Sequence, residues 1–381
     1  MADRSILGPA DVDDATFTAI VARALGEDPA DVTVLGSRAT VVPYALDAIT
    51  TAGRYWVTAR AATPSGERAV RMFVKHVQSW SRSPLFQYVP EQLREVAARS
   101  VPWRTEPLVY RSDLLHRLPP GLTMPDALHV SFLDEASAAI WLPALDVVDH
   151  CWETADFAQA AYLLGRLAGC ESVAELAPLG DVDGRNTVRT YAGGRLDMQV
   201  APALRSAELW QAPWLADAFD HELRGSLLDA LDRVPSFVDE LEAAPTAVAH
   251  GDACPNNLLR TVGSDDITLI DYGFWSLQCV GFDLGQLLVG DVQIGRRPAA
   301  TLPELEAACL PAYVDGLRAE GHEVDAATVA RAHALHLMVF SGLSTPLTGP
   351  PAPGAGADDL AHEARERAAI SRFCLDLVAT T

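Results

Sequence analysis

The sequence predicts an α+β protein, in which an antiparallel β-sheet forms early in the chain and a mainly helical part follows it. Three segments near the start are rich in β-branched and aromatic residues, at positions 32–44, 54–62 and 68–77. The pattern changes near Pro143, after which apolar residues recur at helical spacing. Strand patterns that precede a run of helix patterns are typical of α+β architecture.

The N-terminal part contains helices as well as strands. Residues 11–25 are predicted to form an amphipathic helix, with acidic residues in the first turn where the helix dipole favours them. The run from Thr63 to Gly66 predicts a turn between the second and third strands. A further helix is expected from Trp103 to Arg117, and a second hairpin over residues 126–133 and 138–142.

The C-terminal part is predicted to be helical over most of its length. Apolar residues favour one helix face in five segments, at positions 155–168, 215–231, 303–320, 326–343 and 360–378. We therefore expect residues 1–140 to form an N-terminal nucleotide-binding lobe, 141–146 a connector and 147–381 a helical lobe. A cleft between two such parts is a common place for a ligand.

The charge of the chain narrows the range of partners. Its 381 residues include 51 acidic and 29 basic ones, which gives a formal net charge of -22. Such a surface repels the phosphates of nucleic acids and anionic lipids, so neither is expected as a partner. A small molecule, including a cationic one, remains compatible with this charge.

The cysteines and the apolar runs indicate a cytoplasmic protein. The six cysteines are scattered and none lies in a CxxC pair, which argues against a disulfide framework or a structural zinc site. The first residues contain no apolar run suited to a signal peptide. No uninterrupted apolar segment is long enough to cross a bilayer.

Two residue types are scarce. Lysine occurs once, at Lys75, and every other basic residue is arginine. Asparagine occurs three times, at Asn186, Asn256 and Asn257. Where the composition disfavours a residue type, a surviving copy points to a chemical need for that side chain.

The pattern with the most chemistry lies between residues 249 and 273. His250-Gly251-Asp252 comes shortly before Asn257, and after a turn an apolar run ends at Asp271. A strand–turn–strand hairpin over this segment would bring Asn257 and Asp271 together. Transfer of a phosphoryl group to a hydroxyl needs a carboxylate that accepts the proton, and an amide oxygen and a second carboxylate suit magnesium.

This segment resembles the catalytic loop HGDxxxxN of the aminoglycoside phosphotransferase family, and Ile270-Asp271 resembles the metal-binding aspartate of that family. The run from Gly281 to Leu284 resembles the family's GxDL element. The resemblance implies a protein-kinase-like, two-lobed α+β fold. It also implies that Asp252 is the catalytic base and that Asn257 and Asp271 bind Mg2+. ATP or GTP is the implied co-substrate, and Asp283 is implied to hold backbone amides of the loop.

Lys75 lies on the third strand, where kinase-like folds carry a lysine that binds the nucleotide phosphates. A guanidinium is not an equivalent substitute for a compact ammonium at a tight phosphate site. Such a lysine needs a carboxylate from the following helix, and Glu106 is our first choice because its segment continues into the predicted helix. Glu91 and Glu95 remain alternatives.

The loop between the first two strands, residues 44–53, is expected to face the nucleotide. Thr50 and Thr51 offer hydroxyls and backbone amides to phosphates. The loop has neither a GxGxxG nor a P-loop pattern, so a plain hairpin loop is the alternative interpretation.

The predicted activity is transfer of a phosphoryl group from ATP or GTP to a hydroxyl of a small molecule. The family resemblance favours an antibiotic of the aminoglycoside or nucleoside type, and hence a resistance enzyme. A metabolic kinase for a sugar or for choline shares the same nucleotide chemistry and is the first alternative. The second is an inactive nucleotide-binding module, which would be expected to have lost Lys75, Asp252 or a metal ligand.

Overall fold

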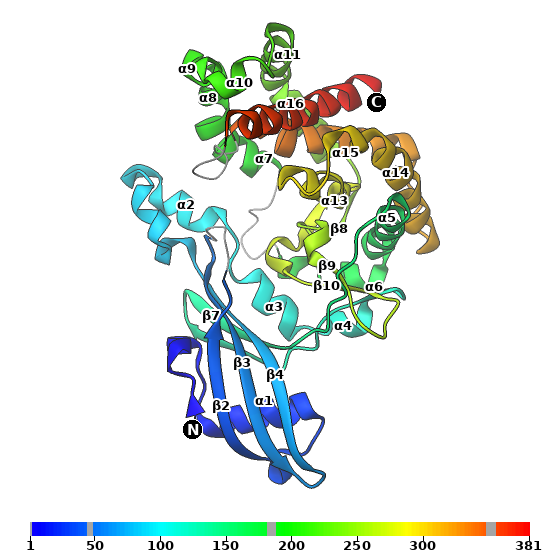
Figure 1. Ribbon diagram of the computed structural model, residues 1–381. Helices are drawn as coiled ribbons and strands as arrows, with labels where there is room; N and C mark the ends of the chain where they lie inside the picture. Colours follow the sequence, from blue (N-terminus) through cyan, green and yellow to red (C-terminus); the bar gives the residue numbers. More distant parts are fainter. Residues whose placement is uncertain (1, 44–48, 181–187, 348–355) are drawn as a thin grey trace. The chain divides into compact units, whose positions relative to one another are not determined.

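The computed structural model describes residues 2–43, 49–180, 188–347 and 356–381 (Figure 1). The chain divides into two compact units that are not continuous in sequence. Unit 1 comprises Met1–Arg117, Thr123–Val148 and Arg260–Phe274, and unit 2 comprises Leu118–Leu122, Asp149–Leu259 and Trp275–Thr381. The lobe boundaries expected from the sequence, at residues 140 and 146, remain a prediction.

Unit 1 is built on a six-stranded sheet in the order β1-β2-β3-β4-β7-β6. All pairs are antiparallel except β1 with β2, which is parallel. The strands are β1 (Ala2–Asp3), β2 (Thr33–Val41), β3 (Thr51–Thr63), β4 (Gly66–Gln78), β6 (His129–Asp134) and β7 (Ser137–Pro143). The helices of this unit are α1 (Asp14–Leu25), α2 (Arg94–Ser100), α3 (Thr105–Arg111) and α4 (Leu114–Arg117).

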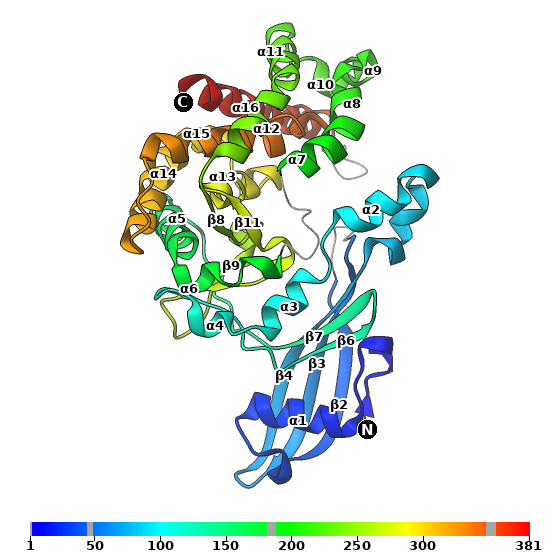
Figure 2. The same cartoon turned by 180° about the vertical axis from the view of Figure 1, so that it is seen from behind.

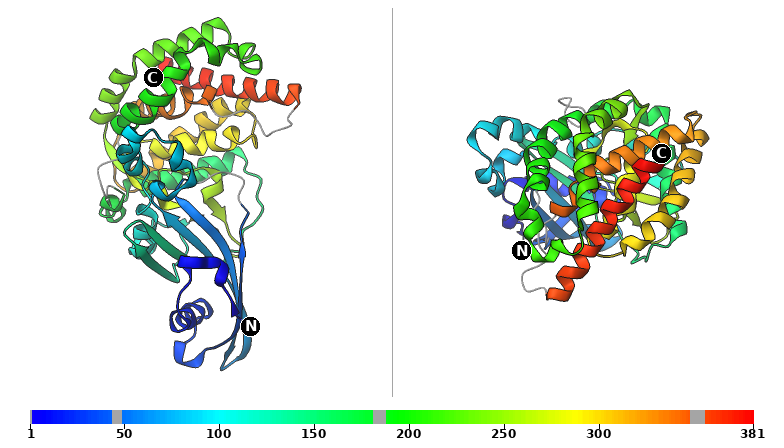
Figure 3. Two further views of the ribbon diagram at one scale, coloured as in Figure 1. Left: turned by 90° about the vertical axis from the view of Figure 1, so that its left-hand side faces the viewer. Right: turned by 90° about the horizontal axis from the view of Figure 1, so that it is seen from above.

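Helix α1 covers one face of this sheet (Figure 3, left, where α1 is blue). Its apolar residues, including Phe17 and Val21, join a buried cluster with Val57, Met72 and Val74 of the sheet. Successive side chains of a strand point to opposite faces. Because Met72 and Val74 face α1, the side chain of Lys75 points to the other face of β4.

Unit 2 is mainly helical and contains one two-stranded ladder. Strands β8 (Thr246–Ala249) and β11 (Ser276–Cys279) are antiparallel, and β8 packs against α5 (Figure 2). The longer helices are α5 (Thr154–Gly169), α11 (His221–Asp232), α12 (Val234–Ala243), α13 (Phe282–Gln293), α14 (Leu302–Ala319), α15 (Ala326–Leu337) and α16 (Ala357–Thr380). Shorter ones are α6 (Glu171–Ala174), α7 (Val188–Tyr191), α8 (Ala201–Arg205), α9 (Ala207–Gln211) and α10 (Pro213–Ala216). Among the described residues, every helix is too short or too polar to span a lipid bilayer.

Two helix predictions were wrong in their extent. The helix expected from Trp103 to Arg117 is interrupted at Ser112. The Ser112 hydroxyl donates to the carbonyl of Val109 at 2.7 Å and accepts from the amide of Leu114 at 3.2 Å. A short polar side chain that bonds to nearby backbone in this way competes with helix continuation. The helix expected over 215–231 is likewise divided, into α10 and α11.

Candidate active site

Unit 1 holds a compact cluster of three charged side chains. The Lys75 ammonium lies 2.6 Å from Oε2 of Glu106 and 2.9 Å from Oδ1 of Asp271. Lys75 and Glu106 are almost completely buried, whereas 39% of the Asp271 side chain is exposed. Lysine and glutamate are seldom buried unless they are paired. The cluster therefore presents one partly exposed carboxylate beside an ammonium that two carboxylates hold in position.

Burial and charge act on Lys75 in opposite directions. Removal from water lowers the pKa of the ammonium, but the charges of Glu106 and Asp271 outweigh this effect and raise it above its ordinary value. Lys75 is consequently a permanent cation at neutral pH. A fixed positive charge of this kind suits an anionic ligand such as a phosphate.

Three elements bring the cluster together. Lys75 lies on β4, opposite Arg54 on β3 and Ile140 on β7. Glu106 lies in the first turn of α3, and Pro107 follows it at a position where a helix does not need the backbone N–H. Asp271 directly follows the Ile267–Leu269 strand and residue Ile270.

Asp271 has a backbone φ of 64°, a left-handed conformation that is rare for residues other than glycine. The residue after it, Tyr272, is fully buried and packs edge-on against Tyr110 of α3, with ring centroids 5.5 Å apart. Aromatic packing thus anchors the chain on one side of Asp271 to the helix that carries Glu106. Unusual backbone geometry held by its surroundings is found most often at functional sites.

In unit 2 the segment after β8 is held by a single carboxylate. The Asp283 oxygens accept hydrogen bonds from the backbone amides of His250 and Gly251, each at 2.8 Å. Burial raises the pKa of Asp283 to about 6, while these two hydrogen bonds act in the opposite direction. The amide of Asp252 also donates to Nδ1 of His250 at 3.3 Å. The loop is therefore fixed through its backbone.

Helix α13, which carries Asp283, also contacts the loop further along. A Cβ atom added to Gly290 would lie 2.7 Å from Cβ of Cys254, so this close approach requires glycine. At the start of the helix, the amide of Gly281 donates to the Tyr313 hydroxyl at 3.1 Å. Tyr313 was not singled out from the sequence, because no motif marks it.

Asn257 fixes the position of Asp252. Its side-chain nitrogen donates to the backbone carbonyl of Asp252 at 2.8 Å and to the carboxylate oxygen Oδ2 at 3.0 Å. Both amide hydrogens are thereby used, so the amide oxygen is the part of Asn257 left to bind a further group. An amide oxygen is a suitable ligand for magnesium, and the carboxylate of Asp271 is another. The donor atoms of these two residues thus fit the predicted metal.

The remaining predicted residues lie outside these two clusters. Thr50 precedes β3 and Thr51 begins it, because the strand starts earlier than the expected Arg54. Residues 44–48 of the expected nucleotide loop lie outside the described residues. Of the alternative partners for Lys75, Glu91 begins a 3-10 turn and Glu95 lies in α2, where it pairs with Arg99 at 3.3 Å. Glu106 is the helix carboxylate beside Lys75.

The comparison with known families assigns the chain to one of them. A model described as the phosphotransferase enzyme family matches residues 111–324, more than half of the chain. The chain belongs to this family. The predicted family resemblance is confirmed, and so is the prediction that the protein is a phosphotransferase. Among curated proteins, no match to the sequence was found.

Three solved structures are similar to this chain over most of its length. An aminoglycoside phosphotransferase from Alicyclobacillus acidocaldarius is 15% identical, over 85% of this chain and 89% of that chain, with a TM-score of 0.50. A spectinomycin phosphotransferase in complex with ADP and spectinomycin is 11% identical over 89% and 93% of the two chains, with a TM-score of 0.48. An amicoumacin kinase in complex with AMP-PNP and Ca2+ is 14% identical over 97% and 96%, with a TM-score of 0.47. The first of these likenesses, with the antiparallel sheet and the helical part, confirms the predicted kinase-like α+β class.

Proposed function

We propose that this phosphotransferase moves the γ-phosphoryl group of ATP or GTP to a hydroxyl of a small molecule, with Asp252 as the general base. The observation that carries the proposal is the buried ammonium of Lys75 between Glu106 and Asp271, 2.6 and 2.9 Å away. The one lysine of the sequence thus lies where a buried, charged ammonium can bind phosphate.

Lys75 is proposed to bind the phosphates of the nucleotide. Glu106 holds the ammonium on one side, so that the lysine does not have to be ordered when the nucleotide arrives. Preorganised charge of this kind stabilises the negative charge that develops during phosphoryl transfer without rearrangement of the site. Thr50 and Thr51 are proposed to offer further donors to the same phosphates.

Asp252 is proposed to accept the proton of the attacking hydroxyl. The hydrogen bond from Asn257 to Oδ2 and the anchoring of the loop by Asp283 fix the direction of this carboxylate. A base held in this way can orient the hydroxyl as well as deprotonate it.

Asn257 and Asp271 are proposed to hold Mg2+. Bound there, the metal would neutralise charge on the phosphates of the nucleotide. The side chain of Asp271 would then serve two cations, Lys75 and the metal.

For the acceptor we propose an antibiotic of the aminoglycoside or nucleoside type, and hence a role in resistance. The family resemblance supports this class, and the net charge of -22 suits a cationic acceptor. We also propose a cytoplasmic location, which agrees with six free cysteines. A sugar or choline-type kinase differs from this proposal in the acceptor alone.

A screen of nucleotide consumption tests the proposal. The purified protein is incubated with Mg-ATP or Mg-GTP and with aminoglycosides, nucleosides, sugars, choline or ethanolamine, and the Asp252→Asn variant serves as the control. We expect acceptor-dependent release of nucleoside diphosphate from the parent alone. A sugar or amino alcohol as best acceptor would establish the metabolic alternative. Nucleotide binding without turnover for any acceptor would favour the inactive module.

A further inference from the structure

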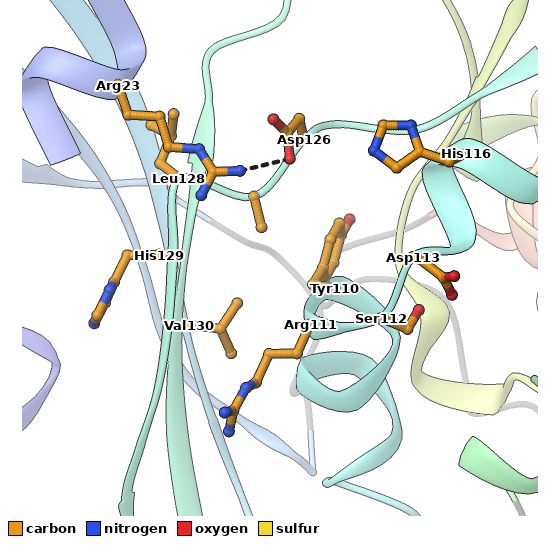
Figure 4. Close-up of a pocket in the computed structure, with 11 residues that line it drawn as sticks. Arg23, Tyr110, Arg111, Ser112, Asp113, His116, Asp126, Leu128, His129 and Val130 are labelled. Atoms are coloured by element: carbon orange, nitrogen blue, oxygen red, sulfur yellow. Dashed lines mark hydrogen bonds and ion pairs between the residues drawn. The ribbon is translucent and has the colours of Figure 1, made fainter. Parts of the chain in front are cut away.

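Unit 1 contains a second candidate site, a cavity of about 490 Å³ at the edge of its sheet (Figure 4). The end of α3, the start of strand β6 and the segment before β6 form its walls, and Arg23 reaches it from α1. Lys75, Glu106 and Asp271 are not among its lining residues. A volume of this size accommodates a small organic molecule.

Both carboxylates that line the cavity already have a partner. Asp126 pairs with Arg23 at 2.8 Å, and Asp113 pairs with Arg117, one helical turn further on, at 2.9 Å. The Ser112 hydroxyl is also engaged, by its two bonds to backbone groups. These polar groups therefore already have partners within the protein. The charge that the cavity can offer to a ligand depends on the remaining lining residues.

Arg111 is the lining charge that is not balanced. Within the described part of the chain no carboxylate pairs with its guanidinium, which instead lies over the ring of Phe132, 5.6 Å from the centroid. Burial and the charge of Arg111 lower the pKa of His129, which favours its neutral imidazole. In the described part of the chain, Arg111 is thus the charged lining residue that has no partner of opposite charge.

Part of the wall is apolar, and the imidazole of His116 also lines the cavity. Tyr110 and Leu128 are buried, and Val130 lies near Arg111 (Figure 4). A ring or a short aliphatic body can bury surface against these side chains at about 25 cal/mol per Å² of apolar area. The guanidinium can at the same time bind a carboxylate or a phosphate through two hydrogen bonds.

We propose that this cavity binds a small organic anion, with its carboxylate or phosphate on Arg111 and its apolar body against Tyr110, Leu128 and Val130. The cavity is separate from the Lys75 cluster, because Glu106 lies in the first turn of α3 and Arg111 in the last. The inference does not depend on the proposed acceptor or on catalysis. The anion is expected to bind to the full-length protein in the absence of nucleotide.

Saturation-transfer NMR with three probes of similar shape tests the proposal. Phenyl phosphate carries a dianionic head, benzoate a carboxylate, and benzyl alcohol no charge. We expect one or both anions to bind and the alcohol to bind at least tenfold more weakly. Arg111→Gln should weaken the anion at least tenfold, about 1.4 kcal/mol. Circular dichroism confirms that the variant is folded.

The matched control is Arg104→Gln at the other end of α3. Arg104 also lies over Phe132, at 5.5 Å, but it does not line the cavity, so its loss should leave anion binding unchanged. Equal binding to the parent and to Arg111→Gln would overturn the proposal, as would the absence of binding by both anions. Displacement of the anion by AMP-PNP would also overturn it, because the anion would then occupy the nucleotide site.

Discussion

The two clusters of candidate active-site residues are held by different kinds of interaction. In unit 1, Lys75 is fixed by side-chain charges from α3 and from the segment after β10 (Ile267–Leu269). In unit 2, the loop that carries Asp252 is fixed by backbone hydrogen bonds to the carboxylate of Asp283. The first arrangement depends on the shape and charge of its side chains. The second depends on the carboxylate of Asp283 and on the side chain of Asn257, which positions Asp252.

This difference predicts the effect of substitutions in each cluster. Substitution of a charged partner in unit 1 should change the affinity for the nucleotide, because the side chains that hold Lys75 also set the charge it presents. Substitution of Asp252 in the loop should change the rate and leave nucleotide binding intact. The four predictions below test this contrast, from the largest expected effect to the smallest.

Asp252→Asn should lower kcat by about 10²–10⁴-fold, which corresponds to about 3–5 kcal/mol of barrier. The amide keeps the size of the carboxylate and can still meet Asn257, but it cannot accept the proton. The nucleotide affinity, measured by calorimetry, should change little, and the transfer rate is measured with the acceptor found in the screen. Asp265→Asn, in an exposed turn, is the control. Near-normal transfer by Asp252→Asn would refute its role as base.

Lys75→Arg should weaken nucleotide binding by about 10–100-fold, or about 1.4–2.8 kcal/mol. The larger planar guanidinium does not fit the buried space between Glu106 and Asp271, 2.6 and 2.9 Å from the ammonium. Binding of AMP-PNP with Mg2+ is the measurement. Arg68→Lys, a charge-conserving change on the same strand, should have no effect. If both variants bind as the parent does, the single lysine is an accident of composition.

Acid should destabilise the protein through His336 of α15. This side chain is fully buried against Phe282, with ring centroids 3.9 Å apart, and burial lowers its pKa to about 3. Below about pH 6.5 the imidazole of His336 binds a proton in the unfolded chain but not in the folded one. The contribution of this group to the free energy of unfolding is therefore fully present above that pH and is lost as the pH decreases. Urea unfolding at pH 7 and pH 5 should differ by about 2 kcal/mol from this group alone.

His336→Leu should reduce that acid sensitivity, and His116→Gln, at an exposed histidine, should not. An unchanged difference between pH 7 and pH 5 in His336→Leu would mean that other groups cause the acid loss. The result sharpens the contrast between the regions. It separates the titration of His336 in unit 2 from that of Glu106 in the Lys75 cluster, where burial raises the pKa of the carboxyl to about 7.

Asp283→Asn should cost about 1–2 kcal/mol of stability and also lower kcat. The oxygen of the amide side chain can still accept a hydrogen bond from one of the two backbone N–H groups. Its NH2 group is a donor, so it cannot accept from the second N–H group. Asp291→Asn, on the same helix, is the control because this carboxylate does not hold the loop. A variant with normal kcat and reduced stability would make Asp283 a purely structural residue.

The sequence was most informative where functional residues are close together in the chain. Asp252 and Asn257 lie in one short segment, and a fixed spacing is visible without a structure. Lys75 was singled out by its scarcity and by its place on a predicted strand. Both signals are local, which is why the family and the general fold could be predicted before any contact was known.

Properties that arise from tertiary contacts were not predictable. Glu106 was the first choice from the sequence, but Glu91 and Glu95 remained open, and it is the packing of α3 that brings Glu106 to 2.6 Å from Lys75. The left-handed backbone of Asp271 has no sequence signature, since aspartate usually occupies other regions. The cavity beside Arg111 depends on residues from α1, α3 and β6, which share no motif.

The presence of a single lysine has a consequence for chemical labelling. Lys75 is the one side-chain amine of the sequence, and in the structure it is buried and held as a cation by two carboxylates. An ammonium with a raised pKa has little of the neutral amine that attacks acylating reagents. Amine-directed dyes and crosslinkers should therefore leave the side chains of the folded protein unmodified. Acylation of Lys75 would report that the cluster has opened.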